Sequence, residues 1–191
     1  MTATSQMKAK ADAFYALHHG PKAFIIPNPW DAGSARLLAH LGFKALATTS
    51  MGYAFSIGQR DGTLTRDQTF ANAADLASAT DLPVSADLEN GFGDSPEIVA
   101  ETIRFTAATG IVGGSIEDSS GNQDAPIYDI GLAVARIEAG QVGVAARAVQ
   151  HGIVENGHDD VKAGERRRID PLRRELLCGR LRETEERRLE R

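Results

Sequence analysis

The first 150 residues alternate short apolar runs with longer stretches of helical periodicity, and this alternation constrains the fold more than any other feature. Four runs of strand length are each followed by a helix-like stretch, and they occupy residues 23–28, 45–50, 82–87 and 113–118. Strands that alternate with helices are typical of right-handed βαβ units and of a parallel sheet. The sequence therefore predicts an α/β fold.

The expected helices cover residues 5–19, 31–41, 65–78, 96–109 and 129–149. Ser5 is a candidate cap for the first helix, and Gly42 is placed to terminate the second. A glycine-punctuated loop is expected over residues 51–62. Four βα units at this spacing make half of an eightfold barrel, which needs about 250 residues. We expect a partial (β/α)8 TIM barrel of about four to five βα units, with an open four-stranded sheet as the alternative.

The composition changes abruptly after residue 150. No Phe, Trp or Tyr follows Tyr128, no alanine follows Ala163, and about half of the residues from His151 onward are charged. A chain with so few apolar residues cannot bury a core of its own. We therefore expect an incomplete barrel domain over residues 1–150 and a charged, partly helical or disordered tail over residues 151–191.

Charge and cysteine content exclude several classes of partner. The net charge is −5, and the tail carries eleven Lys and Arg against ten Asp and Glu, so neither favours nucleic acid. No apolar run approaches the roughly 18–20 residues of a membrane span, and the N-terminus lacks the pattern of a signal peptide. The single cysteine, Cys178, cannot form an internal disulfide, so we expect a cytoplasmic protein without a membrane partner.

Acidic side chains cluster where the predicted strands end. Asp87 ends the third run and Glu89 lies two residues further on, Glu117 lies at the end of the fourth, and Asp61 lies in the loop after the second. The carboxyl ends of parallel strands are where such folds place their active sites, and alternation would put Asp87 and Glu89 on one face. Carboxylates gathered without a nearby cation repel one another, so the pattern predicts a divalent metal with oxygen ligands, Mg²⁺ first and Mn²⁺ next.

Each of these segments also has a purely structural interpretation. An acidic residue at a strand end is often a solvated turn or a helix cap, and Asp118 before Ser-Ser-Gly fits a turn. Asn90-Gly-Phe-Gly predicts a tight turn whose glycines adopt positive φ, although bare backbone also lets a ligand approach closely. Residues 48–52 are either a polar strand terminus or a cradle of amides for a carboxylate or phosphonate oxygen.

Together, these segments resemble the isocitrate lyase/phosphoenolpyruvate mutase family over roughly residues 8–140. The most specific motifs are Ala86-Asp-Leu-Glu-Asn-Gly-Phe-Gly and Gly114-Ser-Ile-Glu-Asp, which occur in order. The other matching segments are Pro27-Asn-Pro-Trp-Asp-Ala-Gly-Ser-Ala, Thr49-Ser-Met-Gly, Arg60-Asp-Gly, Tyr128-Asp and Ala133-Val-Ala-Arg-Ile.

The resemblance implies a (β/α)8 barrel enzyme, usually a homo-oligomer, that makes or breaks a C–C or P–C bond next to a 2-oxo acid or enolate. It implies Mg²⁺ bound through Asp87, with Asp61, Glu89 and Glu117 helping directly or through water. Asp61, Asp87 and Glu117 are thus the expected catalytic carboxylates. The expected contacts to a small 2-oxo acid or phosphonate substrate are Thr49, Ser50, Met51, Asn90 and Gly91.

Two segments depart from the family pattern. The lyases carry a Lys-Lys-Cys-Gly-His loop after the fourth strand, whereas residues 119–128 here contain neither cysteine nor lysine, which favours the members named as phosphonomutases. The family's fifth strand, with its substrate-binding arginine, is not evident after Val149. We therefore expect a truncation or frameshift near residues 139–155, and a chain with low turnover. The alternative function is a non-catalytic barrel fragment that associates with another chain.

Overall fold

A computed structural model describes residues 3–145 and 153–155 of the chain. The chain divides into two units, Met1–Gly157 and His158–Arg191, and only the first contains described residues. The predicted tail therefore lies outside the described residues, apart from three of its members. The predicted division at residue 150 stays a prediction.

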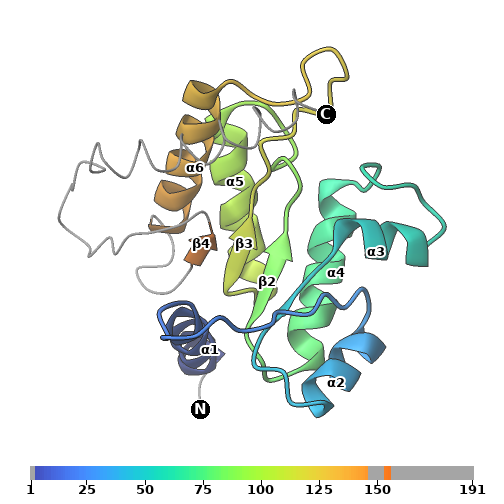
Figure 1. The fold of residues 1–191 in the computed structure, drawn as a ribbon, viewed down its shortest axis with the longest axis vertical. Helices are drawn as coiled ribbons and strands as arrows, with labels where there is room; N and C mark the ends of the chain where they lie inside the picture. The colour runs from blue at the N-terminus through green and yellow to red at the C-terminus, as the bar shows by residue number, and fades with distance from the viewer. Residues whose placement is uncertain (1–2, 146–152, 156–191) are drawn as a thin grey trace. The chain divides into compact units, whose positions relative to one another are not determined.

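The described strands form one parallel sheet in which strand order follows chain order (Figure 1). In register, Asp87 lies opposite Ser115, and Ser115 lies opposite Glu155. This arrangement confirms the α/β class and the parallel sheet predicted from the alternating pattern. The strands are β1 (Leu46–Ala47), β2 (Val84–Asp87), β3 (Gly113–Ser115) and β4 (Ile153–Glu155).

Helices occupy the segments between the strands, and the five predicted helices are present. Side-chain caps set three of their starts: Asp31, Thr65 and Ser95 each accept a hydrogen bond from a backbone N–H of the first turn. No helix of the described part is long and apolar enough to cross a bilayer. The helices are α1 (Ala3–His18), α2 (Ala32–His40), α3 (Ser50–Ser56), α4 (Arg66–Ala79), α5 (Pro96–Thr106), which continues into the 3₁₀ turn η1 (Ala107–Thr109), and α6 (Ile130–Ala145).

Gly42 ends α2 as predicted, with a φ of +91° that only glycine adopts at little cost. The predicted cap at Ser5 is wrong, because α1 begins at Ala3 and Ser5 lies inside it. The predicted loop over residues 51–62 is also partly wrong. Thr49 accepts the Gly52 N–H and caps α3, so a helix occupies the first half of this segment.

The predicted first strand over residues 23–28 forms no ladder. Its carbonyl at Pro27 accepts the Ala47 N–H at 3.1 Å, and the Asn28 amide donates to the Ala47 carbonyl at 3.2 Å. Pro27 and Pro29 have no N–H to donate, so the segment lies along β1 without continuing its hydrogen-bond pattern.

A strand does follow α6, which corrects the expectation that the family's fifth strand would not be found after Val149, although β4 (Ile153–Glu155) contains no arginine. β4 pairs in parallel with β3 over three residues. So short a run leaves no periodicity in the sequence, and the surrounding charged residues mask it. The sequence beyond it lies outside the described residues.

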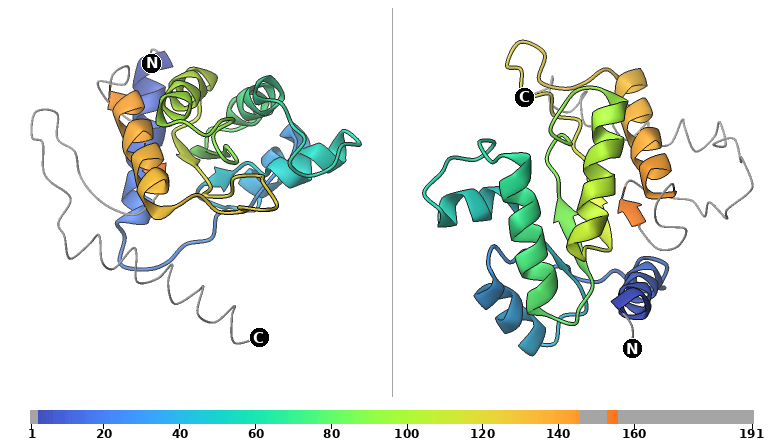
Figure 2. Two further views of the ribbon diagram at one scale, coloured as in Figure 1. Left: turned by 90° about the horizontal axis from the view of Figure 1, so that it is seen from above. Right: turned by 180° about the vertical axis from the view of Figure 1, so that it is seen from behind.

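Helices α4 and α5 cover one face of the sheet (Figure 2). Alternate strand residues, among them Leu46, Val84 and Ala86, are fully buried there against Leu76 and Val99 of these helices. Burial of each such Leu or Val side chain stabilises the fold by about 1.5–3 kcal/mol. The face and its helices together form the main core.

The amino ends of the strands are closed by α1. Phe14 is fully buried and packs with Ala45 and Val112, the residues just before β1 and β3. At the opposite, carboxyl ends the strands carry polar residues, and the candidate site lies there.

Candidate functional site

A cavity of about 270 Å³ opens at the carboxyl ends of the strands. Two of the predicted carboxylates, Asp87 and Glu117, line it together with small polar side chains. Strand alternation explains why Ser85 and Asp87 of β2 both face the cavity, because Val84 and Ala86, before and between them, point into the core instead. The lining residues are Asn28, Ala47, Thr48, Thr49, Ser85, Asp87, Ser115 and Glu117.

Asp87 is held at the end of β2 by donors from the start of α3 and from the residue two positions after it. Its Oδ2 accepts the Ser50 N–H at 2.9 Å and the Ser50 hydroxyl at 2.8 Å, and its Oδ1 accepts the Glu89 N–H at 3.1 Å. Its own N–H donates to Thr48 Oγ1 at 2.9 Å. These bonds fix the orientation of the carboxylate before any ligand arrives.

Glu89 does not reach the site by strand alternation as expected. Its φ of +48° places it in the left-handed region, so the chain turns out of the strand directly after Leu88. Its carbonyl accepts the Glu117 N–H at 2.7 Å, which joins the two acidic segments. Its Oε1 is buried and has no hydrogen-bond partner. Such an unpaired acceptor is unfavourable without a further donor or cation.

The acidic residues lie within electrostatic reach of one another. The pKa of Glu89 is raised to about 7, first because burial disfavours the charged carboxylate. The negative charges of Asp87, Asp61 and Glu117 raise it further. Burial is likewise the first cause of the raised pKa of Glu117, followed by the charges of Asp87, Asp61 and Asp118. Asp61 itself is exposed, in the turn between α3 and α4.

These carboxylates do not form a closed metal cage. Within the described residues, no three His, Cys, Asp or Glu side chains are close enough to hold one metal ion. Charge repulsion acts over several Å, whereas Mg²⁺ bonds its ligand oxygens at about 2.0–2.1 Å and keeps several waters. The all-oxygen donors and the unpaired Glu89 Oε1 therefore fit a hydrated divalent cation that one carboxylate binds directly.

The predicted substrate loop, Thr49 to Met51, begins helix α3 at the rim of the cavity. Thr49 Oγ1 accepts the Gly52 N–H at 3.2 Å, and both donors of Ser50 are committed to Asp87. The Met51 side chain is half exposed. The loop thus lies where expected, but three of its polar groups already have partners within the chain.

Asn90 and Gly91 form the predicted tight turn and are committed to it. Asn90 Oδ1 accepts the Phe92 N–H at 3.0 Å, and Gly91 has a φ of +78°. The second glycine is needed for a different reason than predicted: a Cβ at Gly93 would lie 2.7 Å from the Ile98 side chain. Within the turn of residues 90–93, the second residue with a positive φ is Phe92, at +63°, and not Gly93.

Sequence reasoning missed two residues that hold this turn. The Arg136 guanidinium donates to the carbonyls of Asn90, Gly93 and Asp94, and the Tyr128 hydroxyl donates to the Asp94 carboxylate. Both lie in the family-like segments around residues 128 and 136, and a lone arginine among the apolar residues of α6 was the available signal.

Comparisons with known proteins identify the family. Residues 14–156 match the sequence profile of phosphoenolpyruvate phosphomutase. An uncharacterized protein of Mycobacterium tuberculosis H37Rv is 39% identical over 128 residues, which make up 66% of this chain and 47% of that protein.

Solved structures agree. A proposed lyase/mutase of Burkholderia cenocepacia J2315 is 55% identical with a TM-score of 0.75, covering 80% of this chain and 55% of that one. A 2,3-dimethylmalate lyase, described as a member of the PEP mutase/isocitrate lyase superfamily, is 30% identical with a TM-score of 0.66, covering 81% and 53%. This chain spans about half the length of these relatives. It belongs to the phosphoenolpyruvate mutase family of the PEP mutase/isocitrate lyase superfamily.

Proposed function

We propose that this chain carries the metal- and substrate-binding edge of a Mg²⁺-dependent lyase or phosphonomutase. The reaction makes or breaks a C–C or P–C bond next to a 2-oxo acid or enolate, and the scaffold is a partial (β/α)8 barrel. Family membership supports the reaction class. The observation that carries the proposal is Asp87, oriented by three donors at a cavity where burial and like charges raise the pKa of Glu89 and Glu117.

Asp87 would hold the cation directly, and Asp61, Glu89 and Glu117 would help to hold it through water. The unpaired Glu89 Oε1 would accept a hydrogen bond from a metal-bound water. This bond would offset the free-energy cost of burying the oxygen without a partner. The bound Mg²⁺ would act as a Lewis acid on the enolate oxygen of the substrate. The like-charge repulsion among the carboxylates would fall at the same time.

The chain's own groups would orient the substrate. Residues Thr49 to Met51 would bind its carboxylate or phosphonate group. Asn90 and Gly91 would make further contacts with the substrate. Ser50 would link the two halves of the site, because its N–H and hydroxyl already hold Asp87. The protein would work in the cytoplasm as a homo-oligomer, with a small 2-oxo acid or phosphonate substrate and neither nucleic acid nor membrane as partner.

The proposal is tested by Mn²⁺ titration of residues 1–191, followed by electron paramagnetic resonance at pH 8, where Glu89 is mostly ionised. Replacing Asp87 by Asn preserves its size and removes its charge. Asp87→Asn should weaken Mn²⁺ binding by about 10–100-fold or more, the range seen when groups around a metal are lost.

The matched control is Asp75→Asn on α4, outside the cavity lining. It should bind Mn²⁺ as the wild type does. Equal affinities in Asp87→Asn and the wild type, or no binding by the folded wild type, would refute the proposed site.

A second candidate function is that of a non-catalytic fragment that associates with another chain. Three large apolar side chains on or directly after the short helices α2 and α3 favour it: Leu37 is 59% exposed, Leu41 64% and Phe55 62%. Exposed apolar side chains of this size favour association with another surface. Light scattering after size exclusion decides this point, since a monodisperse monomer that binds Mn²⁺ at Asp87 would exclude it.

A further inference from the structure

A buried arginine lies outside the carboxylate site. Arg136 of α6 is 1% exposed and has no acidic ion-pair partner among the described residues. A buried charge is costly unless other groups compensate it. Its compensation comes from backbone carbonyls and from the ring of Tyr128, whose centroid lies 4.1 Å from the guanidinium carbon.

The carbonyls belong to the loop 90–94, which directly follows Glu89. Arg136 Nη1 donates to Gly93 O at 2.6 Å and to Asp94 O at 2.5 Å, and Nη2 donates to Asn90 O. A planar guanidinium can hold several acceptors at once, whereas the lysine ammonium is a compact point charge.

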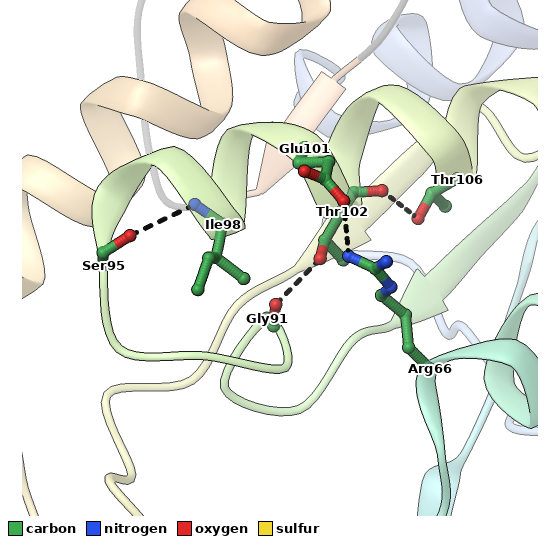
Figure 3. Close-up of polar contacts among 7 residues, drawn as sticks. All are labelled: Arg66, Gly91, Ser95, Ile98, Glu101, Thr102 and Thr106. Carbon is green, nitrogen blue, oxygen red and sulfur yellow. Dashed lines mark hydrogen bonds and ion pairs between the residues drawn. The ribbon is translucent and has the colours of Figure 1, made fainter.

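Two further side chains close the same loop. The Thr102 hydroxyl of α5 donates to Gly91 O at 2.8 Å in a fully buried contact (Figure 3). The Tyr128 hydroxyl donates to Asp94 Oδ1 at 2.6 Å and accepts from Asn90 Nδ2 at 3.2 Å. Four of the five loop carbonyls thus have a donor from an arginine or a threonine of α5 or α6.

The loop needs such restraint because the backbone is strained both within it and at the residue just before it. Glu89 and Phe92 both have positive φ although neither is glycine. Residues held in sparsely populated conformations persist only where their surroundings over-determine them. The network around Arg136 meets that condition.

We propose that Arg136, with Tyr128, is a positioning residue that holds loop 90–94 in one conformation and thereby presents Glu89 to the cation site. Its effect on metal binding rests on the proposed function, whereas its effect on the loop does not. Loss of the guanidinium leaves three carbonyls without their donor and relaxes the left-handed turn at Glu89. It thereby weakens the hydrogen bonds that Glu89 would accept from metal-bound waters.

The test compares Arg136→Met, Arg136→Lys and Tyr128→Phe with the wild-type chain of residues 1–191. Amide hydrogen exchange is followed by mass spectrometry for peptides covering the loop and, as reference, α4. In Arg136→Met the loop should exchange about tenfold faster or more, since hydrogen bonds to a charged donor are lost, with α4 unchanged. Mn²⁺ affinity per folded molecule should fall by about tenfold or more.

Arg136→Lys keeps the charge and should therefore retain part of the slow loop exchange and part of the Mn²⁺ affinity. Tyr128→Phe should give a smaller increase in loop exchange than Arg136→Met. Arg104→Met on α5 is the control and should match the wild type. Unchanged loop exchange in Arg136→Met, or an equal rise in α4, would overturn the proposal, as would tight Mn²⁺ binding with a mobile loop. If Arg136→Met does not fold, the lysine and phenylalanine variants decide. A wild type that binds no Mn²⁺ would refute the proposed function, and loop exchange alone would then decide the role of Arg136.

Discussion

Glu89 combines three unfavourable features in one residue. Its backbone is left-handed, one carboxylate oxygen is buried without a partner, and burial with neighbouring negative charges raises its pKa to about 7. Left-handed backbone at a non-glycine residue alone costs on the order of 1–3 kcal/mol. Proteins retain such strain mainly at functional sites, so Glu89 is the residue whose energetics are best explained by a ligand.

The raised pKa predicts a specific dependence of stability on pH. The folded state holds the Glu89 proton up to about pH 7, whereas a glutamate in the unfolded chain releases it near its ordinary pKa of 4.5. The folded state therefore binds more protons between these values, and its stabilisation by this group is lost as the pH rises from about 4.5 through 7. Replacing Glu89 by Gln removes that loss.

In metal-free buffer, Glu89→Gln should therefore gain stability over the wild type as the pH is raised from 5 to 8. The gain should be roughly 1–2 kcal/mol, reduced by solvent screening because the side chain is only partly buried. Urea unfolding at both pH values measures it. Glu138→Gln, an exposed residue of α6, should show no such change. A constant difference between Glu89→Gln and wild type across this range would contradict the assignment.

At this scale, sequence reasoning found the acidic residues because strand-end position is a local property. Asp87 and Glu117 line one cavity, as their places after two neighbouring strands predicted. The contacts of Arg136 were not predictable in the same way. They join α6 to a loop more than 40 residues earlier, and no local pattern encodes which carbonyls a buried arginine will meet.

At the scale of elements, the packing of α1 under the sheet depends on a glycine. A Cβ at Gly113 would lie 2.6 Å from the Phe14 ring and 3.2 Å from Ser85 Oγ. Contacts this short force neighbouring groups to move, and Phe14 is fully buried. The absence of a side chain at the start of β3 thus allows α1 to close the amino end of the sheet.

Gly113→Ala should therefore destabilise the fold by about 1–3 kcal/mol, the usual cost of overpacking a core. Gly33→Ala in α2 is the matched control, because its Cβ would meet only an ordinary contact at 3.5 Å. That substitution should stabilise by about 0.4–1 kcal/mol through the unfolded chain. Denaturant unfolding gives the free energy of unfolding of each variant. Equal values for the two would show that the packing of Phe14 does not depend on the missing side chain at Gly113.

The helices were predictable because their caps and periodicity are local. The predictions of elements that were wrong also have local causes. Prolines removed the donors that the first predicted strand needed, and a threonine cap started α3 where glycines had suggested a loop. β4 was missed because three residues are too few to show a period, so only its pairing with β3 reveals it.

At the scale of the molecule, the described part is a parallel sheet with helices α4 and α5 on one face and an acidic, polar edge at its carboxyl ends. Membership of the phosphoenolpyruvate mutase family follows from residues 14–156. Substrate, metal and assembly remain proposals, and the predicted frameshift near residues 139–155 reaches into segments outside the described residues.

Anomalous diffraction from crystals of this chain soaked in Mn²⁺ shows whether Asp87 binds the cation. We predict an anomalous peak bonded to Asp87 at about the 2 Å metal–oxygen distance of hard cations, with Glu89 and Glu117 joined through water. A saturated crystal with no peak at Asp87, or with its peak elsewhere on the chain, would contradict it.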